Sequence, residues 1–273
     1  MTQFFTTPDG LRLAYDDQGS GLPLLCLAGL TRNMADFDPV LPLTARCRLI
    51  RLDSRGRGAS DHAPWQSYTV LQEAADAIAL MDHLGLGRFA ILGTSRGGLI
   101  AMLLAALHKP RLMGVFLNDI GPEIDPAGLE VIKTYIGIRP DYADYDAAAL
   151  GLSRAYAASF PGVPLAQWRA MAQRLYRAAP DGLDLRYDPA LRDAVLQSAA
   201  PADLWALFDA LAGLPLAVLR GANSDLLSAD TLAQMTARHL GVISATVPDR
   251  GHVPFLDEPQ SVALLHQFLD CLS

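Results

Sequence analysis

Long hydrophobic runs and clusters of basic residues are both missing from this 273-residue sequence. The longest apolar stretches, such as residues 99–107, are about half the ~20 residues that a bilayer crossing needs, so we expect no membrane association. The 29 acidic residues outnumber the 22 basic ones, and no Lys/Arg run occurs, which argues against nucleic-acid binding. Residues 1–10 lack the basic leader and apolar stretch of a secretory signal, so we expect a cytoplasmic protein.

Cysteine is also scarce. The three cysteines, Cys26, Cys47 and Cys271, are odd in number and lack the spacing of metal ligands, so we expect no metal site and no other cofactor. Cys26 and Cys47 stand in apolar stretches that are typical of strands, which predicts small buried thiols. Apolar residues nevertheless make up 51% of the chain, enough for one large domain or a domain with an insertion.

Short apolar strands alternate with helical patterns at both ends of the sequence. The strand-like segments are residues 11–15, 24–27, 48–52, 89–92, 115–117, 216–219 and 243–247. The helical patterns between and after them cover residues 70–84, 99–107, 230–239 and 260–272. This alternation predicts an α/β fold, with a parallel sheet that helices cover on both faces.

The alternation stops near Gly121. From there to residue 212 the chain shows helical patterns broken by prolines and no convincing strand. The candidate helices are residues 129–136, 147–159, 165–178, 191–197 and 202–211. We therefore predict an α/β core domain of residues 1–121 and 213–273, interrupted by an all-helical insertion of residues 122–212.

The segment from Phe89 to Ile100 carries the most specific chemical signal. It places the motif Gly93-Thr94-Ser95-Arg96-Gly97 between a predicted strand and a predicted apolar helix. A serine at such a tight turn has a strained backbone and an exposed hydroxyl, and close approach of the chain requires small residues at 93 and 97. The helix that follows also points its first N–H groups toward developing negative charge. Ser95 is therefore the predicted nucleophile.

These motifs resemble the α/β-hydrolase family, and the resemblance covers nearly the whole chain. It implies a mostly parallel eight-stranded sheet flanked by helices, and a helical cap at the insertion. The family's oxyanion-hole segment corresponds here to Ala28-Gly29-Leu30, with alanine where histidine is usual. By position, the oxyanion donors are the backbone N–H groups of Leu30 and Arg96, which the change at residue 28 need not remove.

Residues 53–61 match the family's Asp-x-Arg-Gly-x-Gly-x-Ser loop, as Asp53-Ser54-Arg55-Gly56-Arg57-Gly58-Ala59-Ser60-Asp61. Glycine-rich loops also bind phosphate, but no helix N-terminus follows this one directly. We interpret the loop as structural.

Six histidines compete for the role of general base. Four of them fall on or at the ends of predicted helices, where a solvated or core role is expected: His83, His108, His239 and His266. His62 follows the loop of residues 53–61. His252 comes directly after the last predicted strand, between a glycine and a nearby proline, where the family places its histidine. A neutral imidazole there takes the serine proton and later returns it to the leaving group.

The acid of the triad has two candidates. Its carboxylate must accept a hydrogen bond from the second ring nitrogen of the histidine. The family's usual order places it after the strand at 216–219, in a Gly-x-x-Asp pattern, but position 224 is serine and Asp225 comes one residue later. Asp119 follows the strand at 115–117, where some members of the family carry the acid. We favour Asp225 and keep Asp119 as the alternative.

The insertion is similar to the cap that covers the active site in this family and excludes water. Trp168 on one of its helices, and Arg32 and Phe37 near the oxyanion segment, are candidate substrate-pocket residues. The side chain of Arg96 either attracts an acidic group of the substrate or lies along the helix surface.

The resulting hypothesis is a serine hydrolase that acts on a small carboxylic ester through an acyl-enzyme, with a small-molecule substrate as its expected partner and its oligomeric state left open. The same triad also serves hydrolysis of a C–C bond, an amide or a lactone. Epoxide or haloalkane chemistry is disfavoured, since those relatives use an aspartate nucleophile. A non-catalytic ligand-binding protein on the same fold is the alternative from another class.

Overall fold

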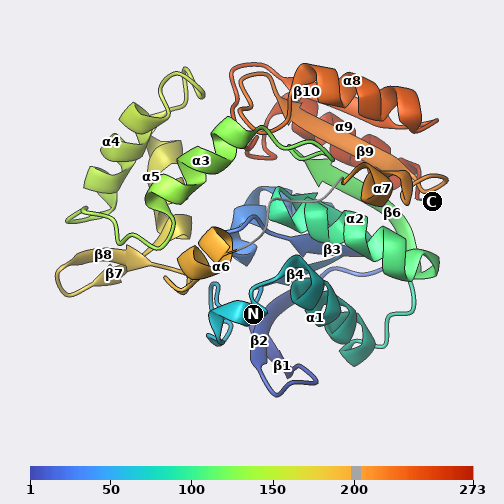
Figure 1. Ribbon diagram of the computed structural model, residues 1–273, viewed down its shortest axis with the longest axis horizontal. Helices are drawn as coiled ribbons and strands as arrows, with labels where there is room; N and C mark the ends of the chain where they lie inside the picture. Colours follow the sequence, from blue (N-terminus) through green and yellow to red (C-terminus); the bar gives the residue numbers. More distant parts are fainter. Residues whose placement is uncertain (198–203, 273) are drawn as a thin grey trace.

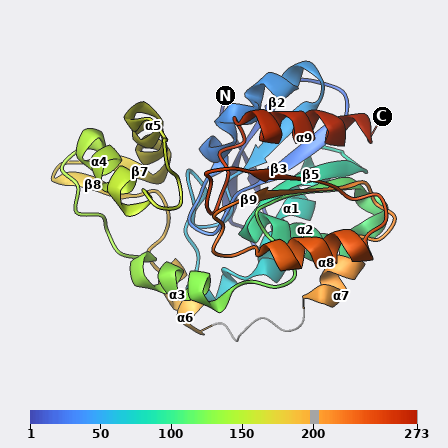
Figure 2. The same ribbon diagram turned by 90° about the horizontal axis from the view of Figure 1, so that it is seen from above.

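The computed structural model describes residues 1–197 and 204–272, and it has a central sheet between two layers of helices (Figures 1 and 2). In the described part of the chain the sheet has eight strands in the order β1-β2-β4-β3-β5-β6-β9-β10. The strands are β1 (Gln3–Thr6), β2 (Arg12–Gln18), β3 (Pro23–Leu27), β4 (Arg48–Leu52), β5 (Phe89–Thr94), β6 (Leu112–Asn118), β9 (Leu216–Gly221) and β10 (Ile243–Val247).

In sheet order, the strands from β4 to β10 are parallel to one another, and β2 is antiparallel to both of its neighbours, β1 and β4. Its inner strands are mainly apolar because helices cover both faces, and every residue of β5 is buried. Successive side chains point to opposite faces. In β3, Leu24 and Cys26 pack into the cluster on one face, and Leu25 and Leu27 into the cluster on the other. The predicted α/β fold with a mostly parallel eight-stranded sheet is confirmed.

Figure 2 shows the two helical layers edge-on. On one face lie α1 (Val70–His83), α2 (Arg96–His108) and α8 (Ala229–Arg238). The other face is covered by α9 (Pro259–Asp270) and by the 3₁₀ segment η1 (Met34–Ala45), which contribute to the cluster that also holds Cys47. Cys26 and Cys47 are buried thiols, as expected.

Most of the chain between β6 and β9 forms a second group of elements in Figure 1, although its last helix lies beside the sheet. It contains α3 (Pro126–Tyr135), α4 (Tyr145–Ala155), α5 (Leu165–Leu175), β7 (Tyr176–Ala179), β8 (Gly182–Leu185), α6 (Leu191–Gln197) and α7 (Trp205–Asp209). The prediction that this segment is all-helical is wrong, because β7 and β8 pair as an antiparallel hairpin. The helix expected over residues 165–178 ends at Leu175, since Pro180-Asp181-Gly182 is a turn sequence that brings the chain back on itself.

The end of this segment packs with the sheet. Part of the helix predicted over 202–211 lies outside the described residues, and the described part contains α7. Phe208 and Leu211 join the apolar cluster beneath α1 and α2. By packing, the chain from α7 onward therefore belongs with the core, although the predicted boundary was residue 213. Among the described helices, none has both the length and the hydropathy that a membrane crossing requires.

Candidate active site

Ser95 stands at the sharp turn between β5 and α2. Its backbone has φ 50° and ψ −116°, a conformation that residues other than glycine rarely adopt. The turn is possible because glycines flank it: a Cβ on Gly97 would lie 1.9 Å from the carbonyl oxygen of Leu27, and one on Gly93 would lie 2.6 Å from the backbone of Gly97. The close approach of β3, β5 and α2 thus holds the serine at the carboxyl edge of the sheet.

His252 reaches this serine from the loop after β10. Its Nε2 lies 2.9 Å from Ser95 Oγ, and its Nδ1 lies 2.7 Å from Oδ2 of Asp119. Asp119 follows β6 directly, is completely buried, and also accepts a hydrogen bond from the backbone N–H of Gly221 (2.7 Å). The three side chains therefore form one continuous hydrogen-bonded chain, in which the carboxylate holds the imidazole against the hydroxyl.

Asp225, the acid that we favoured from the sequence, does not take this position. The residue is exposed, and the loop after β9 instead turns Ser224 inward. The hydroxyl of Ser224 donates to Oδ2 of Asp119 at 2.6 Å, so position 224 contributes a donor to the carboxylate rather than the carboxylate itself. Asp119 reaches His252 because β6 and β9 are neighbours in the sheet, which brings the ends of both strands to the same imidazole. The favoured assignment is corrected to Asp119.

The two predicted oxyanion donors lie on either side of Ser95. Arg96 is the first residue of α2, so its backbone N–H has no acceptor within the helix. Leu30 follows Gly29, whose Cα faces the serine: a Cβ at this glycine would stand 3.7 Å from the Cβ of Ser95. The loop after β3 and the start of α2 thus border the serine from two directions.

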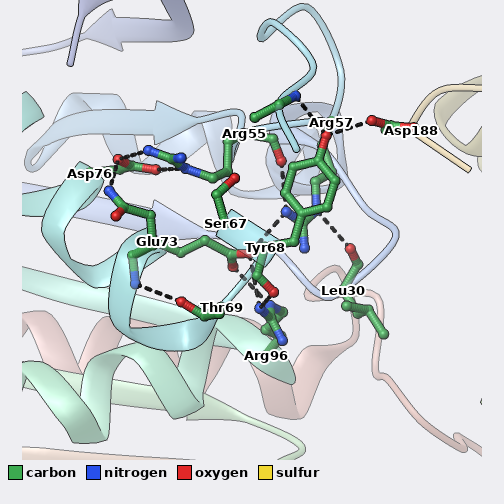
Figure 3. Close-up of polar contacts among 12 residues, drawn as sticks. Leu30, Arg55, Arg57, Ser67, Tyr68, Thr69, Glu73, Asp76, Arg96 and Asp188 are labelled. Carbon is green, nitrogen blue, oxygen red and sulfur yellow. Dashed lines mark hydrogen bonds and ion pairs between the residues drawn. The ribbon is translucent and has the colours of Figure 1, made fainter. Parts of the chain in front are cut away.

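A buried ionic network, which the sequence did not reveal, joins these two segments (Figure 3). Glu73 of α1 is 2% exposed and accepts from Arg57 Nη1 (2.9 Å), Arg96 Nε (2.8 Å) and Arg96 Nη2 (3.0 Å). Arg57 also donates to the carbonyl oxygen of Leu30 (2.9 Å), and Arg96 to that of Tyr68 (2.9 Å). Glu73 therefore links Arg96, the first residue of α2, to the loop that carries Leu30.

Electrostatics keep Glu73 charged. Burial alone would raise the pKa of this carboxyl, but Arg57 and Arg96 outweigh burial and lower the pKa below its ordinary value. The Arg96 side chain is thus bound to Glu73 and Tyr68. This contact differs from both placements that the sequence suggested, which were contact with an acidic group of the substrate and a position along the helix surface.

Asp53 organises the loop of residues 53–61. Its carboxylate accepts from the backbone N–H groups of Met34 (2.6 Å) and Ala59 (2.9 Å). Burial nevertheless raises the pKa of Asp53 to about 6, because the two hydrogen bonds do not compensate for the loss of water around the charge. Close packing explains a glycine of this loop without a phosphate-binding role, since a Cβ on Gly58 would lie 2.0 Å from Asp53 Oδ2.

Two of the predicted pocket residues face the protein interior instead. Phe37 is fully buried in the apolar cluster between η1, the sheet and α9, so it does not face the site. Trp168 is 2% exposed and stacks on Tyr156 within the cluster of α4 and α5. Both predictions are wrong for the same reason: sequence pattern identifies a buried aromatic residue but not what it packs against. Arg32, the third, lies beside the site, as described below.

A cavity of about 270 Å³ opens next to the oxyanion segment. It is lined by residues from the loop after β3, the chain before α1, the start of α2 and α6: Leu30, Trp65, Gln66, Tyr68, Thr69, Val70, Arg96, Ala194, Val195 and Gln197. Its walls are mainly apolar and its volume suits a small molecule. In residues 1–197 and 204–272, no group of three or more His, Cys, Asp and Glu side chains is arranged as metal ligands.

Comparison with known proteins identifies the class. The model of the Alpha/beta hydrolase family matches residues 24–263, and the chain belongs to this family. The protein is therefore a hydrolase.

Individual relatives narrow the comparison further. The chain is 37% identical to the 3-hydroxybutyrate-oligomer hydrolase of Cupriavidus necator over an alignment of 278 residues, which covers 96% of this chain and 94% of the relative. It is 27% identical to the 2-(acetamidomethylene)succinate hydrolase of Mesorhizobium japonicum over 86% of this chain and 83% of that protein. Among solved structures, an alpha/beta hydrolase from Novosphingobium aromaticivorans superposes with a TM-score of 0.94 at 38% identity, covering 99% of this chain and 98% of the other.

Proposed function

We propose that the protein is a serine esterase that cleaves a small carboxylic ester through an acyl-enzyme. The observation that carries this proposal is the chain of contacts from Ser95 Oγ to His252 Nε2 (2.9 Å) and from His252 Nδ1 to Asp119 Oδ2 (2.7 Å). Both distances are within hydrogen-bonding range, and they occur at a serine whose backbone is strained. A purely ligand-binding protein has no need for this alignment.

The mechanism follows from this alignment. Ser95 Oγ attacks the ester carbonyl carbon while His252 Nε2 accepts the hydroxyl proton, and Asp119 stabilises the imidazolium through Nδ1–H. The backbone N–H groups of Leu30 and Arg96 stabilise the oxyanion. The C–O bond then breaks, and the imidazolium gives its proton to the departing alkoxide. A water molecule repeats the two steps on the acyl-enzyme, releasing the acid and restoring the serine.

For the substrate we propose a short ester of a hydroxy acid. The relative from Cupriavidus necator is named for hydrolysis of 3-hydroxybutyrate oligomers, and the similarity spans nearly both chains. The cavity of about 270 Å³ beside Leu30 and Arg96 suits one or two such short units, and its apolar walls suit their methyl and methylene groups.

For the segment between β6 and α7 we propose the role of a cap over this site. Its aromatic cluster includes Phe160 and Trp168 and reaches Phe255, three residues beyond His252. Asn33, in the loop after β3, donates to the carbonyl oxygen of Arg174 at the end of α5 (2.7 Å). These contacts support a cap that closes over the serine and excludes water.

An amide or C–C hydrolase using the same residues is the second candidate, supported by the relative that hydrolyses 2-(acetamidomethylene)succinate. The 27% sequence identity to this relative is lower than the 37% identity to the ester hydrolase, so we place this function second.

Labelling with a fluorophosphonate probe tests the proposal. We expect one stoichiometric adduct at Ser95, release of p-nitrophenol from p-nitrophenyl butyrate, and loss of both in Ser95→Ala with an unchanged unfolding temperature. Ser67→Ala is a matched control, since this hydroxyl is exposed and donates only to a local carbonyl. Wild-type turnover in Ser95→Ala would show that another residue attacks the ester.

A further inference from the structure

Arg32 places a guanidinium group beside the proposed active site. The position that a Cβ on Gly29 would occupy is 3.4 Å from Arg32 Cγ and 3.7 Å from Ser95 Cβ, so the two side chains begin on either side of one glycine. Arg32 also lines a small cavity together with Val253, the residue that follows His252. The Arg32 side chain therefore begins beside the proposed nucleophile and lines one small cavity with the loop of the proposed base.

This guanidinium is weakly paired in the part of the chain that the structure describes. The carboxylate within 4 Å of it there is Asp36, one helical turn along η1, with 3.5 Å between Arg32 Nη1 and Asp36 Oδ2. That separation exceeds the range of a good N–H···O hydrogen bond. The nearby Arg96, by contrast, holds Glu73 through contacts of 2.8 and 3.0 Å.

The state of Asp36 agrees with an incomplete pair. Burial raises the pKa of this carboxyl, although Arg32 and Arg174 both favour its charged form. Two arginines thus do not fully compensate for the loss of water around one carboxylate. The Arg32 side chain remains 20% exposed, so a second anion can reach it.

The groups around Arg32 also suit an anion. Within electrostatic range of it lie Tyr135 of α3, Tyr156 at the end of α4 and Tyr176 at the start of β7. Phenols donate O–H hydrogen bonds, and a guanidinium donates two parallel N–H bonds to one carboxylate. A partly exposed guanidinium that begins beside the proposed nucleophile is therefore suited to bind a carboxylate.

We propose that Arg32 binds a carboxylate group of the substrate, so that the preferred ester carries a free acid close to the bond that is cleaved. This inference rests on the proposed esterase function and makes it more specific. Asp36 is the resting partner of the guanidinium, and the carboxylate of the substrate replaces it with closer, bidentate contacts.

Two matched substrates test the inference: the linear dimer ester of 3-hydroxybutyrate, with its free carboxylate, and the same dimer with a terminal carboxamide. The enzymes are the wild type, Arg32→Gln, Asp36→Asn and Arg169→Gln. Arg169, on the outer side of α5, is paired with Asp146 and exposed, so its variant controls for the loss of one positive charge. Unfolding temperatures and fluorophosphonate labelling show that each variant is folded and that Ser95 is reactive.

We expect Arg32→Gln to lower kcat/KM for the carboxylate dimer by about 10- to 100-fold, mainly through KM, and for the carboxamide by less than about threefold. Asp36→Asn removes the competing carboxylate, so it is expected to lower KM for the carboxylate dimer alone. Arg169→Gln is expected to behave as the wild type.

Equal losses on both substrates in Arg32→Gln, or a higher KM for the carboxylate dimer in Asp36→Asn, would overturn the carboxylate site while leaving the esterase intact. Failure of the wild type to hydrolyse either dimer or any p-nitrophenyl ester, with Ser95 unlabelled, would instead overturn the esterase function and with it this inference.

Discussion

Replacing Glu73 with glutamine tests whether the buried network of Figure 3 positions the two oxyanion donors. Glu73 accepts three hydrogen bonds from two arginines. The amide oxygen of glutamine can retain the bonds to Arg57 Nη1 and Arg96 Nη2, which share Oε1 in the native protein. Its NH₂ group then faces Arg96 Nε–H, where two donors meet. The guanidinium of Arg96 is expected to turn away, which disturbs the first residue of α2.

The magnitude follows from these contacts. One hydrogen bond to a charged group is lost, at about 1.5–3 kcal/mol. The buried guanidinium of Arg57 and the partly buried one of Arg96 also lose their shared anion, and removal of one partner from a buried ion pair costs about 3–5 kcal/mol. Because these terms overlap, we expect the free energy of unfolding to fall by about 3–5 kcal/mol, which corresponds to roughly 10 °C in Tm for a chain of this size.

This stabilisation depends on pH. Because the folded-state pKa of Glu73 is lowered, its contribution is present above the ordinary glutamate pKa and is lost as pH falls through the folded-state value. The difference in unfolding free energy between wild type and Glu73→Gln is therefore expected to shrink in acid.

Asp76→Asn is the matched control. Asp76 lies on the same helix, is equally buried, and holds Arg55 through two hydrogen bonds of 2.7 Å, but it does not contact Leu30 or Arg96. Both variants should lose stability to a similar extent. Well below both unfolding temperatures, we expect Glu73→Gln to lower kcat by at least about tenfold with little change in KM, and Asp76→Asn to lower it by less than about threefold.

Affinity for a boronic acid provides the second measurement, because a boronate adduct places an oxygen where the oxyanion forms. It should weaken in parallel with kcat in Glu73→Gln only. If both variants lost kcat equally, or if Glu73→Gln lost stability and kept full activity, the network would be structural and the positioning role would be refuted.

Three further perturbations have defined outcomes. Asp119→Asn should lower kcat by about 10⁴-fold in p-nitrophenyl ester assays, and Asp225→Asn by less than about threefold; the reverse order would restore the assignment made from sequence. Because the folded-state pKa of Asp53 is raised to about 6, its contribution to the free energy of unfolding falls by about 3 kcal/mol as pH rises from 4 to 7. Urea unfolding of Asp53→Asn should lack this pH-dependent loss, and identical pH profiles for the variant and the wild type would contradict the reasoning. Gly97→Ala should lower the free energy of unfolding in urea by more than about 3 kcal/mol, because the added Cβ meets the backbone of β3. Gly87→Ala, which has open space around it, should be nearly neutral, and equal effects of the two changes would refute the steric account of the turn.

Local signals made the fold and the position of the candidate nucleophile predictable. The alternation of apolar strands and helices predicted the parallel sheet, because strands such as β3 and β5 are buried on both faces. Ser95 was identifiable because its turn needs small residues at fixed positions next to it, and these requirements act within a few residues of the chain. His252 was placed by its position after the last strand.

Features that depend on contacts between distant segments were not predictable. Asp119 and Ser224 meet across two neighbouring strands that are separated by the whole inserted segment, and no spacing rule decides which of positions 119 and 225 faces the imidazole. Glu73 resembles any charged residue in the first turn of a helix, so nothing local indicates its two arginine partners. Phe37 and Trp168 were recognisable as apolar, but the sequence did not indicate which elements they pack against.

The adjacency of β6 and β9 has a consequence for engineering. The chain leaves the sheet after Asn118 and returns at Leu216, and these two strands are hydrogen-bonded neighbours. The chain between them starts and finishes at nearly the same place, so a segment exchanged after Asp119 and before α7 is free to vary in length and content without bending the strands that precede Asp119 and Ser224. Chimeras that take this segment from another member of the family should therefore acquire a new substrate range while the reacting groups keep their spacing.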